Sequence, residues 1–206
     1  MFILCTTWSK GVIWALKVIC NIRLKIQIEK DPLPNEPFII ACKHQSVIET
    51  IFFQTYLSYP VYIIKKELLR IPFYGTFLTQ MGMIPIDRKN GISAIKNIIR
   101  LCNNSFKEGR SVIIFPEGTR VKPLESTRYN PGIIAIKRKF NNIPIIPVAL
   151  NSGMFWSKSS WLKYPGTVIF KILQPLNTNI PDRDFLAKLE KVINSSSNEL
   201  CEDLKH

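Results

Sequence analysis

Short, continuous runs of apolar residues recur along the chain, and each has the length of a β-strand. They are rich in Val, Ile and Phe and do not alternate with polar residues, which is typical of strands buried on both faces of a sheet. The runs occupy residues 38–42, 61–65, 83–86, 111–115, 143–150 and 167–173. Stretches with helical character occupy residues 46–58, 91–108, 132–140 and 182–204. Because strands and helices alternate, the pattern predicts an α/β fold with a mostly parallel central sheet flanked by helices.

The N-terminal segment is strongly apolar, but basic residues interrupt it. No uncharged run approaches the roughly 18–20 residues of a spanning helix, and no small-x-small cleavage site marks a signal peptide. On a helix, Lys10, Lys17 and Lys25 form a narrow stripe opposite a wide apolar face. We expect residues 1–28 to form an amphipathic helix in the membrane interface; packing on the core is the alternative. A Pro-rich break then separates residues 33–206 as the main domain.

Composition indicates the class of protein but does not identify its function. The chain has 206 residues, of which 46% are hydrophobic, as in a globular protein. Its 28 Lys and Arg against 15 Asp and Glu give a formal charge of +13, which attracts nucleic acid, anionic lipid or phosphorylated metabolites. The 5 cysteines are scattered, with no C-x-x-C spacing. We therefore expect a reducing compartment and no structural metal.

Polar residues follow the predicted strands at the points where the strands end. In parallel sheets the site lies beyond the carboxyl ends of the strands. The residues found there are mostly basic: Lys43-His44, Lys65-Lys66-Glu67, Asp87-Arg88 and Glu117-Gly118-Thr119-Arg120. In the last group Gly118 permits a tight turn, and the Arg120 fork suits a phosphate. The sequence thus predicts one anion-binding site at this edge of the sheet.

The stretch "KHQSVIET" has two interpretations. Ser46-x-x-Glu49 is a capping box for the helix that follows, which accounts for both residues without catalysis. It does not account for His44. If Glu49 also accepts a hydrogen bond from one imidazole nitrogen, the other nitrogen is free to act as a base. Cys42, two residues before His44, makes a Cys-His nucleophile pair conceivable, although a small buried hydrophobe is the favoured interpretation.

The ordered blocks "KHQSVIET", "GMIPIDR", "FPEGTR" and "IPIIPVALNSG", within residues 37–153, resemble the glycerolipid acyltransferase family, and most nearly the 1-acylglycerol-3-phosphate acyltransferases. The resemblance implies transfer of a fatty acyl group from acyl-CoA or acyl-carrier protein to the hydroxyl of 1-acylglycerol-3-phosphate. Phosphatidic acid for phospholipid biosynthesis is the implied product. It also implies a location on the cytoplasmic face of the inner (plasma) membrane.

The resemblance assigns roles to particular residues. His44 matches the catalytic base and Glu49 the acid that orients it. The matching substrate-binding positions are Arg88, Glu117, Gly118, Thr119 and Arg120. The implied partners are a lysophospholipid, the acyl donor and the membrane surface, with no cofactor, no metal and no nucleic acid. Two positions depart from the family pattern: Glu49 stands where Asp is usual, and Pro85 where an aromatic residue is usual.

Two alternatives remain open at this point. An acyltransferase acting on another lysolipid or on an acylated amino acid would share the same blocks. A non-enzymatic basic module that binds membranes or nucleic acid would explain the charge equally well, but it would leave the ordered polar residues at the strand ends without a role.

Overall fold

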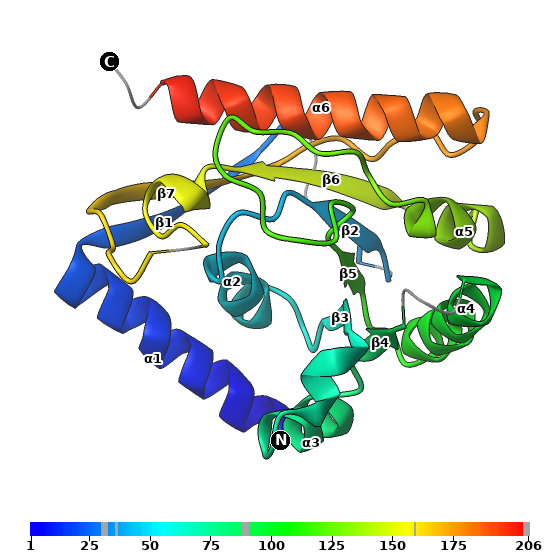
Figure 1. Ribbon diagram of the computed structural model, residues 1–206, viewed down its shortest axis with the longest axis horizontal. Coiled ribbons are helices and arrows are strands. Elements are labelled where there is room, and N and C mark those ends of the chain that lie inside the picture. The colour runs from blue at the N-terminus through cyan, green and yellow to red at the C-terminus, as the bar shows by residue number, and fades with distance from the viewer. Residues whose placement is uncertain (30–32, 36, 88–90, 159, 204–206) are drawn as a thin grey trace.

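The computed structural model describes residues 1–29, 33–35, 37–87, 91–158 and 160–203 (Figure 1). Its strands form a seven-stranded sheet in the order β1-β7-β6-β2-β5-β3-β4. The strands are β1 (Ile22–Ile28), β2 (Ile39–Cys42), β3 (Val61–Lys65), β4 (Ile84–Ile86), β5 (Val112–Ile114), β6 (Ile145–Leu150) and β7 (Gly166–Ile172). The helices are α1 (Phe2–Cys20), α2 (Ile48–Tyr56), α3 (Tyr74–Gln80), α4 (Gly91–Lys107), α5 (Gly132–Lys139) and α6 (Asp182–Glu202), with short 3-10 helices η1 (Lys66–Arg70) and η3 (Ser152–Met154).

The sheet is mostly parallel, which confirms the expected fold class. β6 and β7 pair antiparallel, and the other pairings of the described strands are parallel. The central strands β2, β5 and β6 are buried at every position, as their continuous apolar runs indicate. Each apolar run of the sequence coincides with one of the strands β2 to β7, to within a few residues at its ends.

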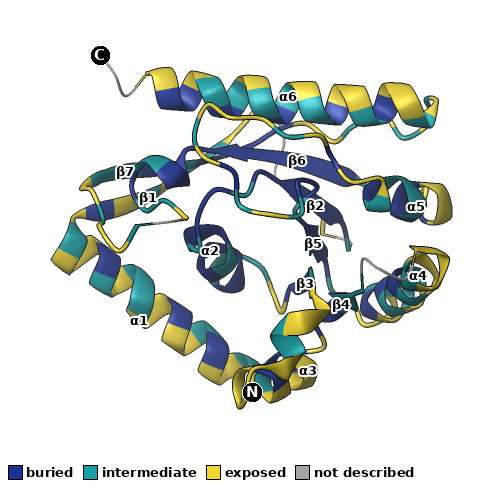
Figure 2. Cartoon of the chain, in the orientation of Figure 1, coloured by how far each residue is buried: buried dark blue, intermediate teal, exposed yellow. Residues whose placement is uncertain are grey.

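Helices cover both faces of the sheet (Figures 1 and 2). On β2, Ile40 and Cys42 belong to the apolar cluster that also contains residues of α1, α2 and α3. Ile39 and Ala41 belong to the cluster on the opposite face, with residues of α4, α5 and α6. Successive side chains of a strand point to opposite faces, so one short apolar strand contributes to two separate cores.

The N-terminal helix is shorter than expected. It ends at Cys20, and Asn21 adopts a left-handed conformation with φ 49°. The remaining residues form β1, an edge strand in which less exposed and more exposed positions roughly alternate, and only Ile22 is buried. The predicted helix over residues 1–28 was therefore wrong beyond residue 20. Both elements are rich in apolar residues, so the change from helical to strand periodicity cannot be recognised in the sequence. The division of the chain at residue 33 stays a prediction.

Helix α1 lies along the surface of the domain (Figure 1). Its length and composition alone would allow it to cross a membrane. However, its buried residues Cys5, Ser9 and Leu16 are distributed along the helix, at the spacing of one helical face. One face is therefore packed along its length, which places the other face outward.

Candidate functional site

A cavity of about 730 Å³ opens at the carboxyl ends of the central strands. Its polar part is lined by His44 from the turn after β2, by Thr119 and Arg120 from the turn after β5, and by Lys158. Its apolar part runs between helices and is lined by residues such as Trp8, Ile51, Phe77, Met83 and Ile98. A single cavity with a cationic end and an apolar body suits an amphiphile that carries an anionic group.

The turn after β5 holds His44 in place. The His44 backbone N–H donates to Glu117 Oε2 at 2.8 Å, and the His44 carbonyl accepts from the Val121 N–H at 2.8 Å. The imidazole stacks on Phe115, with ring centroids 4.0 Å apart and planes inclined by 20°. Backbone and ring are thus fixed by the segment that also supplies Thr119 and Arg120.

The imidazole of His44 is a neutral base. Burial, together with the nearby charges of Arg120 and Lys158, lowers its pKa to about 3. Its Nδ1 atom is buried and has no hydrogen-bond partner among the described residues. The expected hydrogen bond between His44 and Glu49 is therefore not formed in this structure.

Glu49 is fully buried at the start of α2. Its Oε1 atom accepts from the backbone N–H groups of Gln45 and Ser46, at 2.8 Å each, and from the Ser152 hydroxyl at 2.7 Å. Burial raises its pKa to about 7, although these hydrogen bonds oppose the shift. The contact with the Ser46 N–H confirms the carboxylate half of the capping box. The other half is weak, since Ser46 Oγ lies 3.4 Å from the Ile48 N–H.

Lys43 and Glu117 form an ion pair with no exposed side-chain surface. Lys43 Nζ lies 2.7 Å from Glu117 Oε1 and also donates to the Glu125 carbonyl and to Asn194 Oδ1 of α6. Burial raises the pKa of Glu117, while the charge of Lys43 opposes that rise. Glu117 is not among the side chains that line the cavity. Glu117 is therefore not in the substrate-contacting position that was expected. Its carboxylate instead positions His44 by accepting a hydrogen bond from the His44 backbone N–H.

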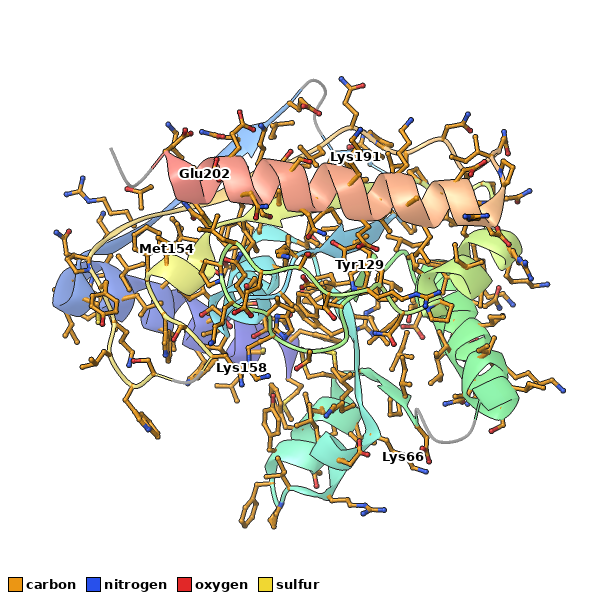
Figure 3. The ribbon with its side chains drawn as sticks, turned by 45° about the horizontal axis from the view of Figure 1, so that its top comes forward. Lys66, Tyr129, Met154, Lys158, Lys191 and Glu202 are labelled. Atoms are coloured by element: carbon orange, nitrogen blue, oxygen red, sulfur yellow. The ribbon has the colours of Figure 1, made fainter. Side chains whose placement is uncertain are left out.

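The turn after β5 presents a cationic surface to the cavity. Gly118 has a φ of 68°, which few other residues adopt, and its N–H donates to the Phe115 carbonyl at 2.9 Å. Lys158, labelled in Figure 3 on the segment after η3, donates to Thr119 Oγ1 at 3.1 Å and to the Arg120 carbonyl at 3.3 Å. Within the described part of the chain, neither Arg120 nor Lys158 pairs with a carboxylate.

The remaining candidates have varied outcomes. Arg88 lies outside the described residues. Lys66 pairs with Asp87 at 3.2 Å, at an exposed position. Cys42 is buried, and burial raises the pKa of its thiol well above the ordinary value, so it is no thiolate nucleophile. Among the residues that the structure describes, no group of three or more His, Cys, Asp and Glu side chains is placed to hold a metal ion.

Sequence reasoning missed Ser152 and Lys158. Both belong to the segment after β6: Ser152 donates to Glu49 of α2, and Lys158 donates to Thr119 of the turn after β5. Ser152 lies within the block "IPIIPVALNSG", but no role was assigned to it, and no block contains Lys158, which reaches the site through the connection between β6 and β7. The one available signal was charge: no Asp or Glu occurs between Glu125 and Asp182.

Comparison with known proteins identifies relatives. A family model described as Acyltransferase matches residues 25–151. The chain is 34% identical over 161 residues to the 1-acyl-sn-glycerol-3-phosphate acyltransferase of Pseudomonas aeruginosa, covering 78% of this chain and 62% of that protein. It is 32% identical over 195 residues to the Bacillus subtilis protein of the same name, covering 90% of this chain and 93% of that protein. It thus spans less than two thirds of the first relative and nearly all of the second.

The fold also has a solved counterpart. The crystal structure of the 1-acyl-sn-glycerophosphate acyltransferase from Thermotoga maritima matches with a TM-score of 0.75. The two chains are 20% identical, and the match covers 97% of this chain and 79% of the other. At this level of identity the likeness extends to the fold.

Proposed function

Because the chain belongs to the acyltransferase family, we propose that it transfers a fatty acyl group to the hydroxyl of 1-acylglycerol-3-phosphate. The donor is a thioester of CoA or of acyl-carrier protein, and the product is phosphatidic acid. One observation carries the proposal: a neutral imidazole, two cations that pair with no carboxylate of the described residues, and a long apolar wall line the same cavity. Relatives from Pseudomonas aeruginosa and Bacillus subtilis are named for this reaction.

His44 acts as the base. The imidazole takes the proton of the acceptor hydroxyl while the oxygen attacks the thioester carbonyl carbon. The new C–O bond forms, the C–S bond breaks, and the proton passes from His44 to the sulfur, which leaves as a thiol. The acyl group moves directly between the two substrates, so the reaction needs no acyl-enzyme.

The acceptor phosphate binds between Arg120 and Lys158 and strengthens the base. Both cations contribute to the low pKa of His44. A bound phosphate offsets their charge, so the pKa of the imidazole rises when the acceptor is in place. His44 is then a better base in the complex than in the free enzyme.

Glu49 orients His44 in that complex. The buried Nδ1 atom has no hydrogen-bond partner among the described residues, and an unsatisfied buried polar atom is costly. Catalytic hydrogen bonds are often poorly formed before the substrate binds. We assign Glu49 as the acceptor of the Nδ1 proton once His44 begins to gain charge.

The enzyme works at a membrane surface. On α1 the exposed apolar side chains include Ile3, Leu4, Trp14 and Ile19, while Trp8 of the same helix lines the cavity. A helix of this kind lies in the membrane interface with its apolar side in the acyl chains. Lipid substrates then reach the cavity from the bilayer, and the water-soluble thioesters place this surface on the cytoplasmic side.

Acyl transfer by the purified protein is the direct test. With acyl-CoA or acyl-carrier protein as donor, we expect 1-acylglycerol-3-phosphate to react faster than lysophosphatidylcholine, monoacylglycerol or an acylated amino acid. Products are resolved by mass spectrometry. Preferred use of an acceptor without a terminal phosphate would contradict the proposal, and so would vesicle or RNA binding without acyl transfer.

Replacing Arg120 tests the phosphate site. Arg120→Ala should reduce kcat/KM for 1-acylglycerol-3-phosphate by about 10- to 100-fold, because a charge-assisted hydrogen bond contributes about 1.5–3 kcal/mol. Lys158→Ala should have a smaller effect of the same kind, and Arg120→Lys should recover part of the loss. Kinetics with monoacylglycerol should change less for all three variants.

A matched control comes from the same loop. Lys122 is exposed, does not line the cavity and lies 3.9 Å from Glu125. Lys122→Ala removes one positive charge from this region and should leave the preference for a phosphorylated acceptor unchanged. If Arg120→Ala reduced the rate with monoacylglycerol as much as with 1-acylglycerol-3-phosphate, Arg120 would have no special role toward the phosphate.

A further inference from the structure

A loop on the rim of the site exposes an unusual group of apolar side chains. We call residues 155–165 the Trp161 loop, of which residue 159 lies outside the described part. The exposed fraction is 94% for Trp161, 65% for Leu162 and 55% for Tyr164. Tryptophan and tyrosine next to lysines are typical of protein surfaces that sit at a membrane interface.

The base of the Trp161 loop is fixed to the end of α1. The Tyr164 N–H donates to the Phe155 carbonyl at 2.9 Å, which closes the loop, and the Gly166 N–H donates to the carbonyl of Asn21 at 3.0 Å. Asn21 caps α1. The exposed residues Val18 and Ile19 lie in the last turn of that helix. The base of the loop therefore lies beside the C-terminal end of α1 (Figures 1 and 2).

The other side of the loop belongs to the catalytic cavity. Lys158 lines that cavity and donates to Thr119 and to the carbonyl of Arg120. Lys163 lies over the ring of Trp156, with Nζ 4.3 Å from the ring centroid. These contacts hold the body of the loop, while Trp161 and Leu162 are exposed.

The charges near the loop complement an anionic surface. No acidic residue occurs between Glu125 and Asp182, and none occurs before Glu29. Both the Trp161 loop and α1 thus carry lysines without carboxylates of their own. Basic residues close to an anionic membrane strengthen binding to it.

We propose that the Trp161 loop is a second membrane-binding element that places Trp161 and Leu162 among the headgroups of an anionic phospholipid bilayer, beside α1. The loop then connects the bilayer directly with Lys158 at the polar end of the cavity. The phosphate of a lipid acceptor lies at the depth of the headgroups. A loop inserted in this way holds Lys158 at the same depth. The proposal concerns lipid binding and can be tested without turnover.

Tryptophan fluorescence tests the position of the loop. Each of three variants keeps one tryptophan, at position 14, 156 or 161, and has Phe at the other three positions. Trp14 reports on α1, and half-buried Trp156 is the matched control within the loop. The variants are added to vesicles of phosphatidylglycerol and brominated phosphatidylcholine. We expect bromine to quench Trp161 about as strongly as Trp14, and both more strongly than Trp156.

Several outcomes would overturn the proposal. Quenching of Trp14 but not of Trp161 would leave α1 as the membrane contact without the loop. Absence of quenching in all three variants would mean that the protein does not enter the bilayer. A blue shift of the Trp161 emission with rising protein concentration, in the absence of vesicles, would assign the loop to contact with a second copy of the chain.

A substitution separates membrane binding from catalysis. Trp161→Ala should weaken binding to the same vesicles by roughly tenfold, because a large apolar side chain no longer leaves water. Its kcat with a short-chain acceptor dissolved as monomers should equal that of the parent, since Trp161 does not line the cavity. Unchanged vesicle affinity would refute the proposal whether or not the protein catalyses acyl transfer.

Discussion

Replacing His44 with alanine should lower kcat for acyl transfer by roughly 10²- to 10⁴-fold, the usual contribution of a general base. The fold should survive, because the contacts of His44 with Glu117 and Val121 are made by its backbone. Initial rates and thermal unfolding, measured on the same preparations, check both expectations. His44→Gln is the matched control for side-chain volume and should be equally inactive.

The same variant should change how stability depends on pH. The pKa of His44 is about 3 in the folded protein, below its ordinary value of 6.5. The imidazole therefore favours the folded state fully above about pH 6.5, and this contribution is lost as the pH falls toward 3. His44→Ala should make the free energy of unfolding less sensitive to acid in that window. In the activity measurement, a rate of acyl transfer by His44→Ala close to that of the parent would exclude His44 as the base.

Replacing Glu49 with glutamine should separate its two roles. The Gln oxygen can still accept from Gln45, Ser46 and Ser152, so the start of α2 is retained. Its amide group cannot balance the charge of a protonated His44, and it can hold the imidazole in the wrong tautomer. We expect kcat to fall about 100-fold or more. Nearly full activity would show that Glu49 only caps the helix.

Stability measurements make the Glu49 experiment decisive. Burial raises the pKa of Glu49 from 4.5 to about 7, so the fold favours its protonated form. That contribution is full below about pH 4.5 and is lost as the pH rises through 7. Glu49→Gln should flatten this dependence and should not lower the melting temperature at pH 8. Glu49→Asp should keep much of the activity, provided that the shorter carboxylate still reaches the imidazole.

The sequence was most informative where one local pattern decided the outcome. Continuous apolar runs located β2 to β7, because central strands of a mostly parallel sheet are buried on both faces. The strand-end rule brought His44, Thr119 and Arg120 into one cavity. The boundary at residue 20 was missed because a helix and an edge strand of similar apolar character follow one another.

The sequence pattern could not predict which residues distant in the chain contact one another in the folded protein. Lys43 stands beside His44 and was expected to join the anion site, but its ammonium group is buried against Glu117. Nothing within either motif distinguishes a lysine aimed at a substrate from one aimed at a neighbouring turn. Lys158 and Ser152 were missed for the same reason, since their relation to the site depends on the path of the chain after β6.

Lys43 acquires its full set of buried acceptors only when the last helix has docked. Asn194 accepts from Lys43, while Ser197 and Leu200 bond to the end of β6 and to Asn151. During synthesis every motif block leaves the ribosome before α6 does. Until then the ammonium group of Lys43 lacks one acceptor and the strands beneath α6 are uncovered. A chain interrupted before residue 182 therefore contains all the recognisable motifs and still cannot shield the ion pair that supports His44.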